Sequence, residues 1–155
     1  MDGQLLYTFL SLAATRDTPE GGIVPIDGMK LIAALAHRYG VPVTWVIDSQ
    51  SVQASKDLIL QGHHEHGDDV ILLIDIPRFL KEAMGKIPHT PGRDVMPASE
   101  AEEIVVLRQK LPQFVTSERA KIKEALPWAE VNVIAADTKT DALVQILKEL
   151  DCIGL

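Results

Sequence analysis

Three histidines and three acidic residues crowd the tract QGHHEHGDDV (61–70), directly before an apolar run. His64 and His66 stand on alternate residues of this tract, and Asp69 follows them. Imidazole nitrogens and carboxylate oxygens are ligands of zinc, and the same groups act as general acids and bases. The tract therefore makes His64, His66 and Asp69 a candidate site for a divalent metal such as zinc. The alternative is a polar turn between a helix and a strand, with solvated histidines and with Asp68 and Asp69 capping the turn.

A second group of candidates consists of acidic residues that follow predicted strands. Asp17 and Asp75 are candidate catalytic carboxylates, and Asp48 and Asp137 are candidate substrate-binding residues. The carboxyl ends of parallel strands meet at one edge of a sheet, so these four side chains are expected to converge. Such a group would suit a cation or a sugar. For Asp17 the alternative is an ordinary loop carboxylate beside its neighbour in the chain.

Trp45 lies within the second predicted strand. An indole ring can serve as a stacking platform for a sugar, which makes Trp45 a candidate substrate-binding residue. The alternative is a core position, because a strand between two helices buries its large aromatic side chains.

Strand-like and helix-like patterns alternate along the chain. Strands are predicted over 5–15, 41–47, 70–76 and 128–137, and the opening of a fifth over 153–155. Helices are predicted over 27–39, 51–60, 104–111, 115–126 and 143–150. The range 16–25 is predicted to be a loop, and 77–98 a loop excursion with one helical turn over 79–84. Asp27 is expected to cap the first helix and Gly40 to end it in the left-handed conformation. This alternation predicts a single α/β domain with a parallel sheet.

Composition excludes several classes of function. The chain has 155 residues, of which 46% are hydrophobic, enough for one domain with a substantial core. A formal net charge of −7 and scattered basic residues argue against a nucleic-acid partner and against a basic membrane-binding surface. No apolar run reaches the length of a membrane span. We expect the lone Cys152 to be a buried structural thiol rather than a nucleophile.

The N-terminal apolar segment could be mistaken for a signal peptide. Asp2 stands where a positively charged region would be needed, and the first basic residue is Arg16. We therefore interpret the segment as a buried strand and expect no signal peptide.

Two segments carry a resemblance to a known family. The segment LAHRYGVPVTWVID (35–48), followed by QGHHEHGDDV (61–70), resembles the polysaccharide deacetylase (NodB-homology) group of the glycoside hydrolase/deacetylase superfamily. The resemblance implies a (β/α) barrel of up to seven strands, a carbohydrate substrate and a bound zinc ion. It also implies that the chain is the N-terminal part of a longer barrel, a partial (β/α)7-type fold.

The chain departs from the family pattern at the metal site. In the family, the first strand ends in a pair of Asp residues, whereas YTFLSLAATRD (7–17) has only Asp17. Aligning the metal motifs puts His64 in place of the leading His and Asp69 in place of a ligand His. The second ligand His has no counterpart in ILLIDIP (71–77).

These observations leave three hypotheses for function. The first is a carbohydrate-active hydrolase domain that acts on a polysaccharide or a small sugar. The second is a catalytically inactive domain that binds a sugar or a partner on the same scaffold. The third, a nucleotide-binding open sheet, is disfavoured because no Gly-rich phosphate loop follows the first strand. The sequence leaves the oligomeric state open.

Overall fold

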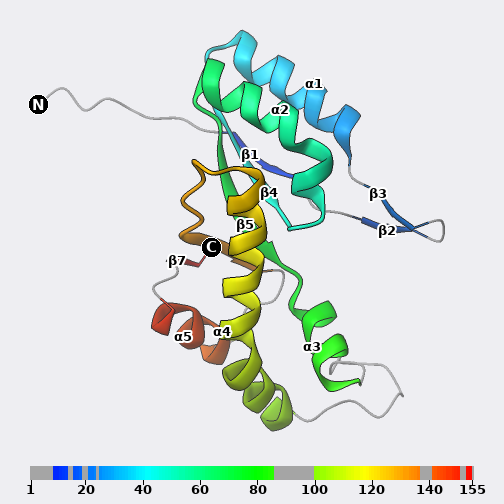
Figure 1. The fold of residues 1–155 in the computed structure, drawn as a ribbon, viewed down its shortest axis with the longest axis vertical. Coiled ribbons are helices and arrows are strands. Elements are labelled where there is room, and N and C mark those ends of the chain that lie inside the picture. Colours follow the sequence, from blue (N-terminus) through cyan, green and yellow to red (C-terminus); the bar gives the residue numbers. More distant parts are fainter. Residues whose placement is uncertain are drawn as a thin grey trace, which may run out of the picture.

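The computed structural model of the chain describes residues 9–13, 16–18, 21–23, 25–85, 100–136, 141–150 and 153–154. Its centre is a five-stranded parallel sheet in the order β1-β4-β5-β6-β7 (Figure 1). These strands are β1 (Phe9–Leu12), β4 (Val43–Ile47), β5 (Asp69–Ile74), β6 (Val133–Ala136) and β7 (Ile153–Gly154). The predicted α/β class with a parallel sheet is therefore confirmed.

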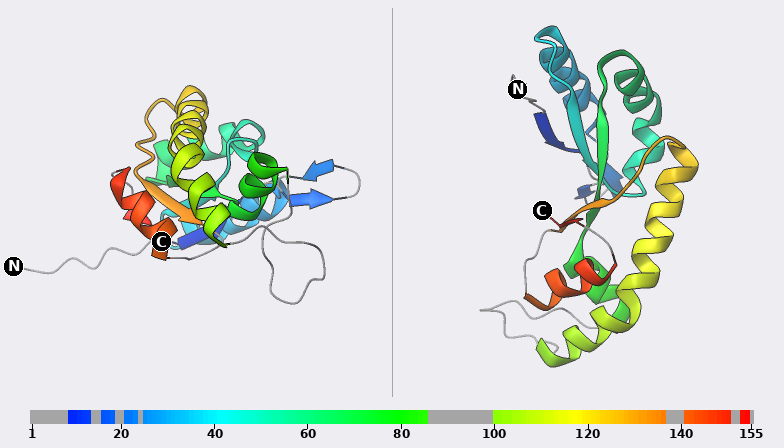
Figure 2. Two further views of the ribbon diagram at one scale, coloured as in Figure 1. Left: turned by 90° about the horizontal axis from the view of Figure 1, so that it is seen from below. Right: turned by 90° about the vertical axis from the view of Figure 1, so that its left-hand side faces the viewer.

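The other elements are five helices and a small hairpin. The helices are α1 (Ile26–Arg38), α2 (Ser51–His66), α3 (Ile76–Met84), α4 (Glu100–Ala125) and α5 (Asp141–Glu149). Strands β2 (Arg16–Thr18) and β3 (Gly21–Ile23) pair antiparallel in a range that was predicted to be a loop. Figure 2 shows α4 running along one side of the sheet, with α5 near its lower end.

The two faces of the sheet have different roles. In the strand register, Trp45 lies level with Ser11 and Val70, and these positions point toward the helices. Side chains of this face join residues from all five helices in one hydrophobic core. The opposite face is also apolar; Val46 and Ile71 are buried there outside the main core. At its β1 edge, Leu10 and Leu12 remain 54% and 55% exposed.

Local sequence explains where the first two helices end. Gly40 and Gly67 both have positive φ, at 68° and 78°, which residues with a Cβ rarely adopt. Gly40 therefore ends the turn after α1 as predicted. Helix α2 runs on to His66, six residues beyond its predicted end at position 60. The histidines of the tract consequently belong to a helix and not to a turn, which corrects that alternative.

The beginnings of two helices also differ from the prediction. Helix α1 begins at Ile26 with Pro25 at the cap position, so Asp27 lies in the first turn and does not cap the helix. Asp75 caps α3, and Pro77 follows within the first turn of that helix, where a missing N–H costs nothing. The range 77–98 thus begins as a helix, which extends the turn predicted over 79–84 toward its N-terminal side. Its residues from 86 onward lie outside the described part of the chain.

The second half of the chain is more continuous than predicted. Helix α4 is a single helix of 26 residues that contains Pro112, where two separate stretches were expected. Its buried positions, including Leu111, Val115 and Ile122, repeat every three or four residues and hold it against the sheet. Strand β6 is shorter than the predicted strand, because the segment from Pro127 to Asn132 forms a turn and an extended connection.

Candidate functional site

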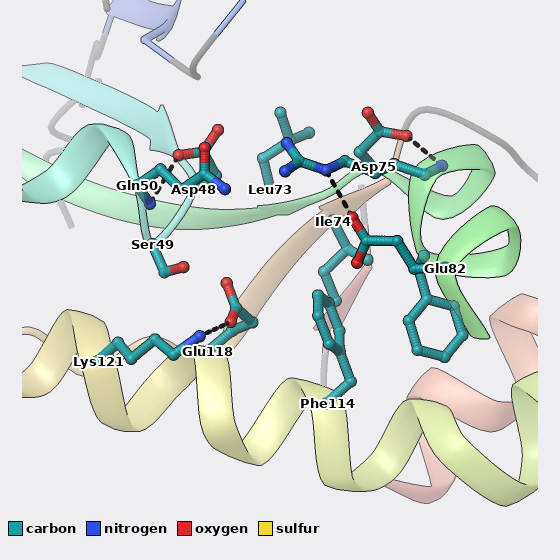
Figure 3. Close-up of a pocket in the computed structure, with 12 residues that line it drawn as sticks. Asp48, Ser49, Gln50, Leu73, Ile74, Asp75, Glu82, Phe114, Glu118 and Lys121 are labelled. Atoms are coloured by element: carbon teal, nitrogen blue, oxygen red, sulfur yellow. Dashed lines mark hydrogen bonds and ion pairs between the residues drawn. The ribbon is translucent and has the colours of Figure 1, made fainter. Parts of the chain in front are cut away.

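A cleft of about 420 Å³ opens at the carboxyl ends of β4 and β5 (Figure 3). This is the edge of a parallel α/β sheet where ligands usually bind. The floor is apolar and comes from the end of β5, while α3 and α4 supply polar and aromatic walls. The residues that line it are Asp48, Ser49, Gln50, Leu73, Ile74, Asp75, Arg78, Phe79, Glu82, Phe114, Glu118 and Lys121.

Two of the predicted acidic residues meet in this cleft, and each is fixed by the start of a helix. One carboxylate oxygen of Asp48 accepts hydrogen bonds from the backbone N–H groups of Gln50 at 3.0 Å and Ser51 at 2.6 Å. Asp75 accepts one from the backbone N–H of Arg78 at 2.8 Å. Both carboxylates are therefore held in place by backbone N–H groups at the start of a helix.

Glu118 is the best-placed carboxylate of the cleft, and sequence reasoning missed it. Its side chain is only 10% exposed, and the Nζ of Lys121 donates a hydrogen bond to its Oε1 at 2.7 Å. Along α4, Glu118 takes the place of an apolar residue in the buried row that includes Val115 and Ile122. A carboxylate at such a position costs free energy of desolvation. In the sequence, Glu118 interrupts the apolar row of this helix, and that interruption could have identified it as a candidate site residue.

The cleft is acidic overall and has an aromatic wall. Its lining includes four carboxylates but only two cationic side chains. Arg78 donates from Nε to Glu82 at 3.1 Å, across one turn of α3. The rings of Phe79 and Phe114 pack with their centroids 5.0 Å apart, which joins α3 to α4 at this wall. The cleft thus combines charged side chains with an aromatic wall, as small-molecule sites commonly do.

The histidine-rich tract lies at the other end of β5, beneath the amino ends of the strands. Its central residue is Asp68, which is 1% exposed. Asp68 accepts hydrogen bonds from His37 Nε2 and the Val43 backbone N–H, both at 2.8 Å, and from Trp45 Nε1 at 3.1 Å. We call these four residues the Asp68 network. The network joins α1 and β4 to the segment that leads into β5, so its role in the described structure is to hold the fold together.

The Asp68 network places Trp45 away from the cleft. The indole is fully buried, belongs to the main core and uses its only polar atom on Asp68. It therefore cannot stack on a sugar, which corrects its assignment as a substrate-binding residue. The physical reason is that side chains alternate between the two faces of a strand, and position 45 of β4 lies on the face that the helices cover.

The same region is packed tightly around Gly62 and His63. A Cβ atom on Gly62 would lie 2.3 Å from Oδ2 of Asp68, so only glycine fits beside the buried carboxylate. His63 donates from Nδ1 to the backbone carbonyl of Asp68 at 2.7 Å. Its ring stacks on Trp128 with 3.6 Å between the centroids. These contacts anchor the end of α2 and the turn before β6.

The three predicted metal ligands do not converge. His64 and Asp69 are exposed, and the exposed ring of His66 stacks on His37 at 3.7 Å. Within the part of the chain that the structure describes, no three His, Cys, Asp or Glu side chains form a group that could hold a metal ion. The described side chains of the tract therefore do not form a zinc site among themselves, and zinc stays a prediction of the family resemblance.

The structure does not describe the side chains of the remaining predicted residues. The backbone of Asp17 lies in β2, but its side chain is not described. Asp137 and Cys152 are outside the described residues altogether. Of the four acidic residues expected to converge, the structure brings together Asp48 and Asp75.

No described helix is both long and apolar enough to cross a membrane. Comparisons with family models, with curated proteins and with solved structures find no match to this chain.

Proposed function

We propose that the cleft at the carboxyl end of the sheet binds a carbohydrate and hydrolyses it, as in the deacetylase and glycoside hydrolase superfamily that segments 35–48 and 61–70 resemble. The scaffold would be part of a (β/α)7-type barrel. Five parallel strands in sequential order support this proposal, because barrels place consecutive strands side by side.

The observation that carries the proposal is the position of Glu118. A charged residue in the buried row of α4 does nothing for packing, and it faces a cleft that also holds Asp48 and Asp75. Residues that lower the stability of the fold and make no compensating packing contact are found mainly at functional sites. The acidic lining also favours neutral hydroxyl-rich ligands over phosphorylated ones.

The chemistry that fits this arrangement is general-base catalysis. The Glu118 carboxylate would take a proton from water while the water oxygen attacks the carbonyl carbon of an acetamide group. The Lys121 ammonium would stabilise the negative charge that develops on the carbonyl oxygen. The C–N bond then breaks, the proton passes to the leaving amine, and acetate and the free amino sugar are released. Asp75 is the candidate for a second catalytic carboxylate, and Asp48 for a ligand to sugar hydroxyls.

A specific observation favours the alternative, a domain that binds a sugar without hydrolysing it. Both Asp48 and Asp75 already use a carboxylate oxygen to accept from backbone N–H groups at the start of a helix. Residues held in this way are suited to fixed hydrogen bonds with a ligand. On this alternative, Glu118 and Lys121 orient the sugar and no bond is broken.

The test is to incubate the purified protein with N-acetylated and with non-acetylated oligosaccharides. Acetate release, new reducing ends and binding heat are measured separately. If the protein is a hydrolase, acetate or new reducing ends should form with the native chain and be lost in Glu118→Gln. The control is Glu124→Gln, which should keep the activity because Glu124 is an exposed residue of the same helix. Binding that needs Glu118 but gives no product would support the binding domain. Absence of both product and binding would reject both functions.

No step of this proposal passes through a metal, because the described residues do not supply a ligand set. Zinc remains a prediction of the family resemblance. Metal analysis of the purified protein tests it independently of the cleft.

A further inference from the structure

The outward face of α1 carries a row of large apolar side chains. Leu31, Leu35 and Tyr39 are 74%, 60% and 72% exposed. Residues four apart lie next to one another along a helix, so the three form one continuous row. The buried residues Met29 and Ala33 lie on the other side of the helix, against the sheet. Single exposed leucines are common in proteins, but a continuous apolar row marks an interaction surface.

A glycine in the same face is not required by the packing of the described residues. Gly28 is exposed within the first turn of α1, where it lies three residues before Leu31. A Cβ atom built there would meet nothing within 4 Å, and Gly28 is absent from the residues with positive φ. Glycine within a helix is unfavourable relative to alanine. Its lack of a side chain is useful only if another backbone approaches this face closely.

Charges at the two ends of α1 make the face complementary to itself. Asp27 lies in the first turn with its side chain fully exposed and 3.9 Å from the ammonium of Lys30, and Arg38 lies in the last turn. If two copies of α1 pack antiparallel, the first turn of each faces the last turn of the other. Asp27 of one copy then lies near Arg38 and the Tyr39 hydroxyl of the second copy. The helix dipoles are also antiparallel in this arrangement, which is favourable.

We propose that α1 is a self-association surface and that its partner is a second copy of this chain. The two copies are related by a twofold axis that passes between Leu31 and Leu35. Leu31 of each copy packs on Leu35 of the other, and Gly28 allows the helices to approach. A twofold contact of this kind uses the same patch on both copies, as in most homodimers. It leaves the acidic cleft, at the carboxyl ends of β4 and β5, outside the contact.

The experiment is sedimentation velocity of the full chain from micromolar to several hundred micromolar concentration. The expected result for the native chain is a concentration-dependent monomer–dimer equilibrium. Leu31→Glu and Leu35→Glu each place a charge in the contact and should raise the dimer dissociation constant by about tenfold or more. The matched control is Val105→Glu on α4, which also replaces a large apolar residue that is 51% exposed. Far-UV circular dichroism checks that each variant keeps its helices.

A charge exchange tests the antiparallel orientation. Asp27→Arg and Arg38→Asp should each weaken the dimer, and the double variant should recover part of the loss because the pair is restored in reverse. A native chain that is monomeric at every concentration overturns the proposal. So does a dimer that survives Leu31→Glu and Leu35→Glu, or one that Val105→Glu weakens to the same extent.

Discussion

At the amino end of the sheet, a buried carboxylate is enclosed by its hydrogen-bond donors, whereas at the carboxyl end the bonded carboxylates also line an open cleft. Asp68 is almost fully buried and satisfied by three donors. Glu118 is nearly as buried, yet among the described residues its side chain accepts a hydrogen bond from Lys121, at the rim of the cleft. Buried carboxylates of similar exposure can thus have opposite roles. A carboxylate that accepts hydrogen bonds from several parts of the fold stabilises it. One with fewer donors, at the rim of a cleft, is available to a ligand.

The largest expected effect comes from Asp68→Asn. The amide group cannot accept from all three donors, and one of its own N–H groups must face a donor. We expect the free energy of unfolding to fall by about 3 kcal/mol or more, measured by urea denaturation. The control is Asp69→Asn at the neighbouring exposed position, where a change within about 0.5 kcal/mol is expected. Equal effects at the two positions would contradict the structural role of the Asp68 network.

The next effect tests how tightly the amino end is packed. Gly62→Ala would force a methyl group against the Asp68 carboxylate, which its three hydrogen bonds hold in place. A loss of about 2 kcal/mol in the free energy of unfolding is expected. The matched substitution is Gly28→Ala, which meets open space on α1 of a single copy. At concentrations where the chain is monomeric it should stabilise the helix by about 0.5–1 kcal/mol. If both substitutions had the same sign, the packing described around Gly62 would be wrong.

A smaller effect of the opposite sign is expected at the carboxyl end. Glu118→Leu restores the apolar row of α4, and the lost ion pair involves a Lys121 side chain that is 55% exposed. The free energy of unfolding should rise by about 1 kcal/mol, since burial of a leucine outweighs an ion pair with an exposed partner. Binding of the oligosaccharide should be lost in the same variant. A variant that is destabilised and still binds would show that Glu118 serves the fold.

The smallest effect is expected for the double substitution of His64 and His66 by alanine. Both side chains are exposed, and the one described ring contact of His66 is a stack on His37. The free energy of unfolding should change by less than about 0.5 kcal/mol. The amount of zinc that copurifies with the protein should also be unchanged. Loss of stoichiometric zinc in this variant would instead restore the metal site that the tract first suggested.

The order of the elements follows from the sequence more readily than the site does. Alternating apolar runs and helical patterns identify β4, β5 and α1, because burial against a sheet requires those periods. The end of α2 was harder to locate, since His63 to His66 have no apolar pattern and the helix continues to Gly67. That difference matters, because a helix directs His64 and His66 away from one another and from the sheet.

Some residues of the candidate site could be predicted from the sequence, and others could not. Asp48 and Asp75 could be placed at the cleft because a residue that follows a parallel strand must lie at that edge. Glu118 comes from α4, far along the chain, and only the packing of that helix against the sheet brings it to the cleft. The sequence offered Asp68 as a metal ligand or as a cap of the turn. Its buried role was missed because its donors come from α1 and β4, whose positions relative to β5 are set by the tertiary fold.

The two tryptophans of the chain both lie at the amino end, Trp45 bonded to Asp68 and Trp128 stacked on His63. Intrinsic fluorescence of this protein therefore reports on one end of the sheet alone. A denaturation followed by tryptophan emission will record the loss of the Asp68 network. A ligand titration will give little signal if the ligand enters the cleft at the far end of β5, so calorimetry or a tryptophan introduced in place of Phe114 is the appropriate probe there.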